Sequence, residues 1–122
     1  MSTDEHVAGG RILVLAGCLC GATGVALSAA AAHLGGAFVG TAASFLLMHA
    51  PVFLAVGLLG GNSILRTGSL ILLVGLLLFS GDLLARDFLG SRLFPMSAPI
   101  GGMLLIGGWL VMAASALVRP RP

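Results

Sequence analysis

Few polar residues of this chain have the chemistry of a functional site, and they lie within or beside long apolar segments. His33 and His49 can bridge helices or relay protons, while Asp82 and Arg86 carry opposite charges four residues apart. On a helix this spacing places Asp82 and Arg86 on one face, within reach of a salt bridge. If the segment spans a membrane, a carboxylate costs about 2.5–3.5 kcal/mol at the bilayer centre and less near an interface. Asp82 therefore needs a partner.

Two interpretations of these residues follow. In the first, which we favour, Asp82 and Arg86 form a local pair that anchors the depth of one helix, and the histidines are structural. In the second, Asp82 belongs to an ion or proton site that includes His49. Pro51 follows His49 by two residues and removes a backbone donor there, which predicts a kink. His33 lies at the end of the first apolar segment, where a helix-end or headgroup contact is sufficient.

The sequence contains no recognisable catalytic or metal-binding motif. The histidines and Asp82 lack a tight ligand spacing, and neither Gly-x-Ser-x-Gly nor a P-loop occurs. Cys18 and Cys20 would point to nearly opposite sides of a helix, so we interpret both as packing residues. We therefore predict no enzyme activity, no metal site and no cofactor.

The composition requires an apolar solvent. Of the 122 residues, 58% are hydrophobic and only 8% are charged, whereas soluble domains carry about 25% charged residues. Nineteen glycines suit closely packed membrane helices. The net charge of +2 comes from arginines near the ends of apolar segments, and they do not form the basic stripe of a nucleic-acid-binding protein.

Four continuously apolar segments predict a single transmembrane domain of four helices. They lack the alternation of barrel strands, and in lipid a helix satisfies its own backbone hydrogen bonds. Short turns make successive helices antiparallel, so we predict an all-α, integral membrane four-helix up-down-up-down bundle. The predicted helices cover residues 12–32, 41–59, 64–84 and 98–118, and an apolar interfacial segment covers residues 86–97. The first segment resembles a secretory signal, but its length predicts a retained helix.

Glycines separated by four residues predict close contacts between helices. Such contacts can join two copies of the chain or two helices of one chain, and we favour the second. Gly101 and Gly102 follow a proline in the first turn of the last predicted helix, where they leave room for a neighbouring backbone. The predicted packing residues are Gly17, Gly21, Gly57, Gly61, Gly101 and Gly102.

Several short elements occur together in this chain: His33, His49, Phe79-Ser80-Gly81, Pro99-Ile100-Gly101-Gly102 and Gly108-Trp109. In this combination, over roughly Gly17 to Leu117, the chain resembles the small bacterial membrane family catalogued as domain of unknown function 423, the YgdD-like proteins. The resemblance implies a four-helix protein of the bacterial inner membrane and supplies no established activity or catalytic residue. The chain departs from the family pattern at Asp82-Leu83-Leu84 and at Ala29 to Ala32.

We predict a non-enzymatic integral membrane protein, a small structural or accessory module that packs against membrane lipids, itself or a larger membrane complex. The alternative is a small ion-coupled or proton-coupled transporter, or a channel-like oligomer, that uses Asp82, Arg86 and His49. An enzyme acting on lipid or quinone is a third class, for which no nucleophile–base pair is recognisable. A polar, hydrated cavity shared by His49 and Asp82 would favour transport.

The distribution of arginines predicts that both termini are cytoplasmic, because cytoplasmic loops carry an excess of positive residues. The side with both termini carries Arg11, Arg66, Arg119 and Arg121, and the other side carries Arg86 and Arg92. Single cysteines at Ser2 and Pro122, in a chain without its native cysteines, should resist a membrane-impermeant maleimide in intact cells. Labelling of both from the periplasm would contradict this orientation.

Overall fold

The computed structural model describes the backbone of residues 3–118 and the side chains of residues 8–118. Within these residues it contains four helices and no strand, which confirms the predicted all-α class. All four helices are long and apolar enough to cross a membrane. They are α1 (Thr3–Leu34), α2 (Val39–Leu59), α3 (Ser63–Phe88) and α4 (Ser97–Ser115).

The helix bounds differ from the predicted ones mainly at polar ends. α1 begins at Thr3 rather than at residue 12, and α3 continues to Phe88 rather than ending at residue 84. The connection before α4 therefore shrinks from the predicted segment 86–97 to residues 89–96. A helix does not have to end where its apolar segment ends, because its backbone hydrogen bonds continue regardless of side-chain polarity. Arg86 and Asp87 thus lie on a helix.

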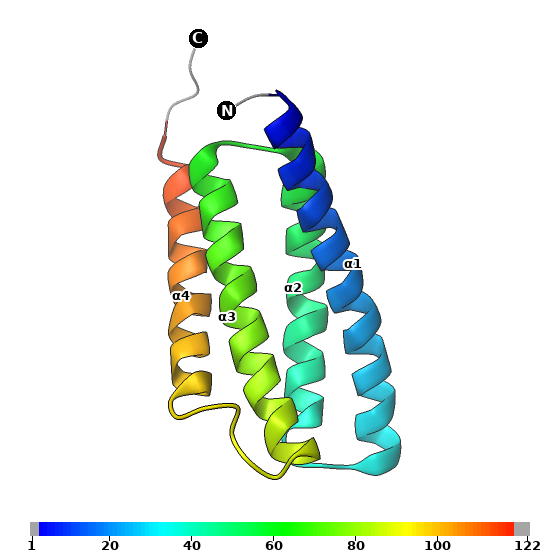
Figure 1. Cartoon of the computed structure of the whole chain (residues 1–122). Coiled ribbons are helices and arrows are strands. Elements are labelled where there is room, and N and C mark those ends of the chain that lie inside the picture. The colour runs from blue at the N-terminus through cyan, green and yellow to red at the C-terminus, as the bar shows by residue number, and fades with distance from the viewer. Residues whose placement is uncertain (1–2, 119–122) are drawn as a thin grey trace.

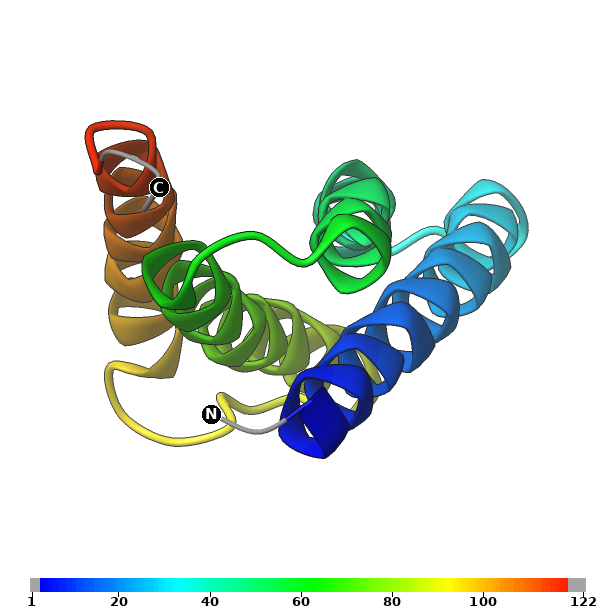
Figure 2. The same cartoon turned by 90° about the horizontal axis from the view of Figure 1, so that it is seen from above.

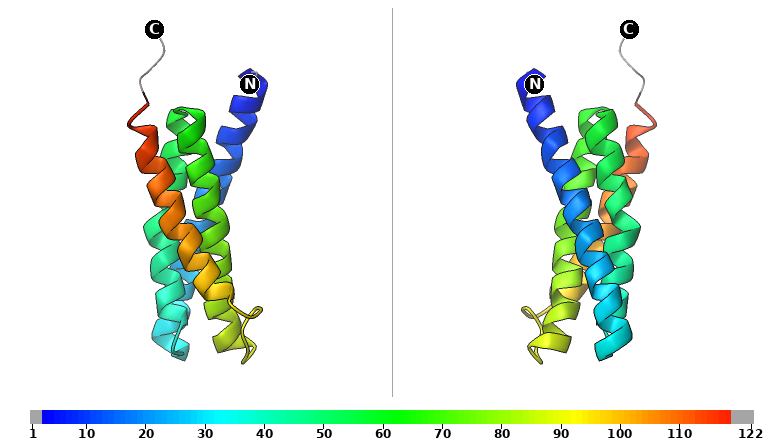
Figure 3. Two further views of the ribbon diagram at one scale, coloured as in Figure 1. Left: turned by 90° about the vertical axis from the view of Figure 1, so that its left-hand side faces the viewer. Right: turned by 90° about the vertical axis from the view of Figure 1, so that its right-hand side faces the viewer.

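The helices form an open array rather than a closed bundle. In the described part of the chain, α1 packs on α2, α2 on α3 and α3 on α4, and the backbones of α1 and α4 do not approach each other. The middle contact is the least extensive of the three, so the array consists of two tight helix pairs. Figure 2 shows α1 and α4 at opposite edges, and Figure 3 shows them inclined in opposite directions. The start of α1 and the end of α4 lie at the same end of the molecule (Figure 1).

Small residues let the backbones of α1 and α2 touch. A Cβ atom on Gly10 would lie 2.7 Å from the Gly57 carbonyl oxygen, and one on Gly17 would lie 2.8 Å from the Ala50 carbonyl oxygen. Gly10 and Gly17 are seven residues apart, as are Ala50 and Gly57. Seven residues make nearly two helical turns, so each pair returns to one face and suits a crossing of about +20°.

The α3–α4 pair repeats this arrangement. A Cβ atom on Gly75 would lie 2.9 Å from the Gly101 carbonyl oxygen, and one on Gly68 would lie 3.1 Å from the Gly108 carbonyl oxygen. The spacing is again seven. A side chain at any of these four positions would collide with the neighbouring backbone, so glycine sets the distance between the two helices.

Three of the six predicted packing residues therefore lie outside close helix contacts: Gly21 and Gly61, which were predicted from the spacing of four, and Gly102, which was predicted from its place beside Gly101. Gly21 would meet only the Ala50 side chain, at 3.8 Å, and Gly102 would meet nothing within 4 Å. Gly61 lies outside the helices, in the connection between α2 and α3, with φ of +94°. The other predicted positions, Gly17, Gly57 and Gly101, do lie in close helix contacts.

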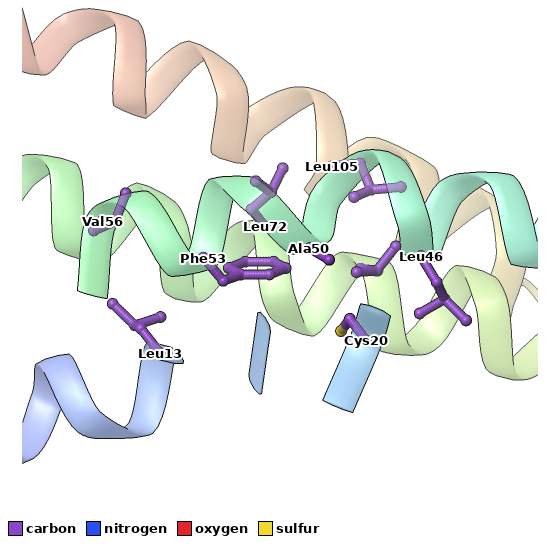
Figure 4. Close-up of a cluster of buried hydrophobic side chains, with 9 residues drawn as sticks. Leu13, Cys20, Leu46, Ala50, Phe53, Val56, Leu72 and Leu105 are labelled. Carbon is purple, nitrogen blue, oxygen red and sulfur yellow. The ribbon is translucent and has the colours of Figure 1, made fainter. Parts of the chain in front are cut away.

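The buried side chains gather along α2 and α3, the two central helices. Phe53, Leu72 and Leu76 are completely buried. Figure 4 shows Phe53 of α2 among side chains from the neighbouring helices. Because lipid tails are as apolar as leucine, close packing rather than escape from water stabilises such a core. The full cluster consists of Leu13, Cys20, Leu46, Ala50, Phe53, Val56, Leu72, Leu76 and Leu105.

Substitution of the adjacent glycines Gly101 and Gly102 tests this packing. A Cβ atom at Gly101 would lie 2.6 Å from the Phe79 backbone nitrogen, so Gly101→Ala should lower the free energy of unfolding by about 1–3 kcal/mol. Gly102→Ala should be neutral or stabilising, because its Cβ would meet open space and alanine favours a helix. Thermal unfolding in one detergent measures both. Equal losses would contradict the proposed contact.

Candidate functional site

Asp82 is completely buried and is the centre of a network at the far end of α3. Its Oδ2 atom lies 3.0 Å from Nη2 of Arg86, so the predicted pair is present. Its Oδ1 atom accepts hydrogen bonds from the Ser97 hydroxyl at 2.6 Å and from the Leu93 backbone N–H at 3.0 Å. A carboxylate with one cation and two donors is well compensated. Asp82 thereby fixes the connection between α3 and the start of α4.

Asp87 links α3 to the start of α2 at the same end of the molecule. Its Oδ2 atom accepts hydrogen bonds from the backbone N–H groups of Phe38 at 2.8 Å and Val39 at 2.7 Å. These groups begin α2, and Phe38 itself provides no side-chain cap. A carboxylate at this position satisfies donors that the helix leaves open and complements the helix dipole. The end of α3 thus caps the start of α2.

Arg86 lies between these two contacts. Besides pairing with Asp82, its guanidinium carbon lies 5.3 Å from the centroid of the Phe38 ring, within the range of a cation–π interaction. We call Asp82, Arg86 and Asp87 the carboxylate clamp. The clamp attaches the connection before α2 and the connection before α4 to the end of α3. This role is structural.

His49 forms a separate network between α2 and α4. The side chain is 2% exposed. The Trp109 indole N–H donates to His49 Nε2 at 3.2 Å, and His49 Nδ1 lies 2.8 Å from the Phe45 carbonyl oxygen. Because an indole nitrogen can only donate, Nε2 accepts, and Nδ1 must carry the proton that it donates to Phe45. Both ring nitrogens of His49 are therefore engaged within the chain.

The described structure does not bring His49 and Asp82 together. No hydrogen bond or ion pair among the described residues joins them. Their α4 partners, Trp109 and Ser97, are twelve residues apart, which corresponds to about 18 Å along a helix. His33 is exposed at the end of α1. Neither do the described residues include a group of three or more potential metal ligands.

Ser80 carries a buried hydroxyl that lies outside both networks. Ser80 is 3% exposed, and its oxygen has no hydrogen-bond partner among the described residues. It lines a cavity of about 220 Å³ together with Thr23 and Cys20.

Comparison with known proteins identifies the family. The family described as "Protein of unknown function (DUF423)" matches residues 20–102, which include both the carboxylate clamp and His49. This chain belongs to the DUF423 family. The resemblance predicted from the sequence is therefore confirmed.

Curated relatives of this DUF423 protein are named as membrane proteins. A UPF0382 membrane protein of Haemophilus influenzae is 32% identical over 108 residues, which cover 84% of this chain and 87% of the relative. One of Staphylococcus haemolyticus is 25% identical over 115 residues, which cover 86% of this chain and 94% of the relative. No solved structure matches the chain.

Sequence reasoning missed several partners of the predicted site residues. The sequence places Asp87 in a connection because the predicted helix ends at residue 84, although an acidic residue close to a turn is a possible helix cap. Ser97 lies two residues before Pro99, a pattern typical of a helix start. Trp109 is the single tryptophan, but no sequence signal pairs it with His49.

A double-mutant cycle measures the clamp. Asp82→Ala should destabilise the protein by about 3–5 kcal/mol, because it also leaves the Ser97 and Leu93 donors without their acceptor. Arg86→Ala should cost less, since that side chain is 23% exposed. The double variant should lose less than the sum, with a coupling of about 0.5–3 kcal/mol. Strictly additive losses in thermal unfolding would show that the two side chains do not interact.

Proposed function

We propose that this DUF423 protein is a non-enzymatic helical module of the bacterial inner membrane that associates with other membrane proteins or with a second copy of itself. The observation that carries this proposal is the internal use of its buried polar groups. Asp82 is engaged by Arg86, Ser97 and Leu93, and both ring nitrogens of His49 are engaged as well. Such groups stabilise the array and are not available to a substrate.

The open array supports association through its edges. In the apolar stretch that could span the membrane, only 22% of the residues of α1 and of α4 are buried, compared with 50% of those of α3. Leu19 on α1 and Leu110 on α4 are 57% and 66% exposed. In a membrane, lipid or another helix covers such faces, and close packing can favour the helix. Because α1 and α4 do not pack on each other, each has room for a partner.

Transport is the less favoured function. The transport hypothesis needs Asp82 and His49 to exchange ions or protons, yet their hydrogen bonds lead to separate parts of α4. We also propose that both termini are cytoplasmic. A common side for the two termini is compatible with either function. The start of α1 and the end of α4 lie at one end of the molecule, in agreement with a common side (Figure 1).

Photocross-linking from the array edges tests the association. A photoreactive residue at Leu19 or Leu110 should give an adduct of defined mass in native membranes, because these side chains face outward. The same residue at Leu72, which is completely buried, is the control and should give none.

Absence of any edge adduct would contradict the proposal. A second measurement addresses transport directly. Proteoliposomes of the purified protein should show no proton or cation flux above empty vesicles, and a flux that Asp82→Asn abolishes would overturn the non-transport assignment.

A further inference from the structure

Ser80 differs from the other buried serines of the described helices. Ser69 donates to the Leu65 carbonyl oxygen at 2.9 Å, one turn earlier on the same helix, and Ser97 donates to Asp82. A bond to the preceding turn is the usual way in which a helical serine satisfies its hydroxyl. The Ser80 side chain is 3% exposed, yet its oxygen has no hydrogen-bond partner among the described residues. Because a buried hydroxyl without a partner is costly, a molecule that supplies the partner would gain binding energy there.

Ser80 lines a cavity of about 220 Å³ between α1 and α3. Cys20 of α1 and Leu46 of α2, which are both buried, line its inner wall (Figure 4). Leu19 of α1 and Leu77 of α3 are 57% and 56% exposed and line its outer part, so the cavity opens at the side of the molecule. The described backbones of α1 and α3 do not pack on each other, so no helix contact closes this opening. The functions discussed above do not account for this cavity.

The cavity lies at the depth of the lipid chains. Ser80 precedes Phe88, the last residue of α3, by eight residues, which is about 12 Å along the helix. The 26 residues of α3 extend over about 39 Å, whereas the hydrocarbon core of a bilayer is about 30 Å thick. Even if the whole excess of about 9 Å lay at this end, Ser80 would still be within the hydrocarbon. A molecule that reaches Ser80 therefore dissolves in the bilayer and enters from the side.

The polar groups of the cavity favour a ligand with a carbonyl oxygen. In hydrocarbon a hydroxyl or amide ligand needs both a donor and an acceptor, whereas a carbonyl oxygen needs only a donor. The Ser80 hydroxyl can donate, and Thr23 brings a second hydroxyl from α1 to the same cavity. The other side chains that line it are those of leucines and Cys20. The volume is below the roughly 300–1,000 Å³ of pockets for drug-sized ligands, so one ring system fits better than a whole lipid.

We propose that this cavity binds the ring of an uncharged, lipid-soluble quinone, with one ring carbonyl accepting a hydrogen bond from the Ser80 hydroxyl. A quinone carries its carbonyl oxygens on an apolar ring, which matches a hydroxyl donor among leucine walls. An isoprenoid tail would leave the cavity past Leu19 and Leu77 into the lipid. The inference concerns binding and includes no redox step. It does not rest on the proposed association with other proteins.

The test uses the full chain in dodecyl maltoside with duroquinone, whose fully methylated ring offers no position for addition of a cysteine thiol. Durene, the same methylated ring without carbonyl oxygens, is the matched ligand. Duroquinone should raise the melting temperature in a concentration-dependent way, as a ligand of the native state does, and durene should bind about fivefold more weakly. Ser80→Ala should weaken duroquinone binding about fivefold, the effect of one neutral hydrogen bond. Ser69→Ala removes a buried serine hydroxyl of the same helix outside the cavity and should leave binding unchanged.

Two further measurements separate the hydrogen bond and the site from general changes in stability. The infrared carbonyl stretch of bound duroquinone should fall in frequency with the native chain and with Ser69→Ala, but not with Ser80→Ala. Thr23→Trp places a large ring at the exposed rim of the cavity and should prevent binding, whereas Ala22→Trp, at the neighbouring exposed position outside the cavity, should not. Circular dichroism verifies that each variant is folded, and Thr23→Phe replaces Thr23→Trp if that chain is not.

Three results would overturn the inference. The first is equal binding of duroquinone and durene, or duroquinone binding that Ser80→Ala does not change, which would indicate a cavity for hydrocarbon alone. The second is duroquinone binding that Thr23→Trp leaves intact, which would place the ligand elsewhere on the protein. The third is a stable dimer that excludes duroquinone and that Thr23→Trp disrupts, which would assign the cavity to a second copy of the chain.

Discussion

Lipid offers no hydrogen-bond partner, and this constraint explains most of what the polar residues of the chain do. A buried carboxylate or imidazole in a membrane protein has to be satisfied by the chain itself. Asp82 meets this requirement with a cation, a hydroxyl and a backbone N–H. The half-buried Asp87 accepts hydrogen bonds from two backbone N–H groups that begin α2. Each carboxylate is therefore also a device that holds a connection in place.

The same constraint applies to the backbone, and here glycine provides the solution. Helices in lipid gain little from burying leucine against leucine, so their contact depends on how closely they approach. Gly10 with Gly57 and Gly75 with Gly101 remove the side chains that would hold the backbones apart. Two tight pairs result, and the looser α2–α3 contact joins them. The hydrogen bond from Trp109 to His49 adds a link between α2 and α4 across that junction.

The two ends of the molecule consequently differ. At one end the carboxylate clamp holds the connection between α1 and α2 and the connection between α3 and α4. At the other end Asn62 caps α3 by accepting from the Leu65 N–H, and its amide donates to the Ser115 carbonyl of α4. That end also carries Arg11 and Arg66 at the mouth of an open groove. The clamped end therefore suits a structural role.

The sequence by itself was sufficient to predict a lipid environment, four helices and the pairing of Asp82 with Arg86. Continuous apolar segments of spanning length are a local property, and so is the four-residue spacing of Asp82 and Arg86. The family resemblance also depended only on short elements along the chain. These features did not require knowledge of which helices are neighbours.

The tertiary structure alone decided which residues meet across the array. In a soluble protein the apolar face of a helix points to the core, but these helices are apolar on every side, so the pattern does not indicate an inward face. For this reason glycines seven apart, rather than four apart, proved to form the contacts. His49 and Trp109 are sixty residues apart, and Asp87 lies forty-eight residues from Val39. Residues at such separations become partners only when their helices pack together. Which helices pack together depends on how closely their backbones fit rather than on composition.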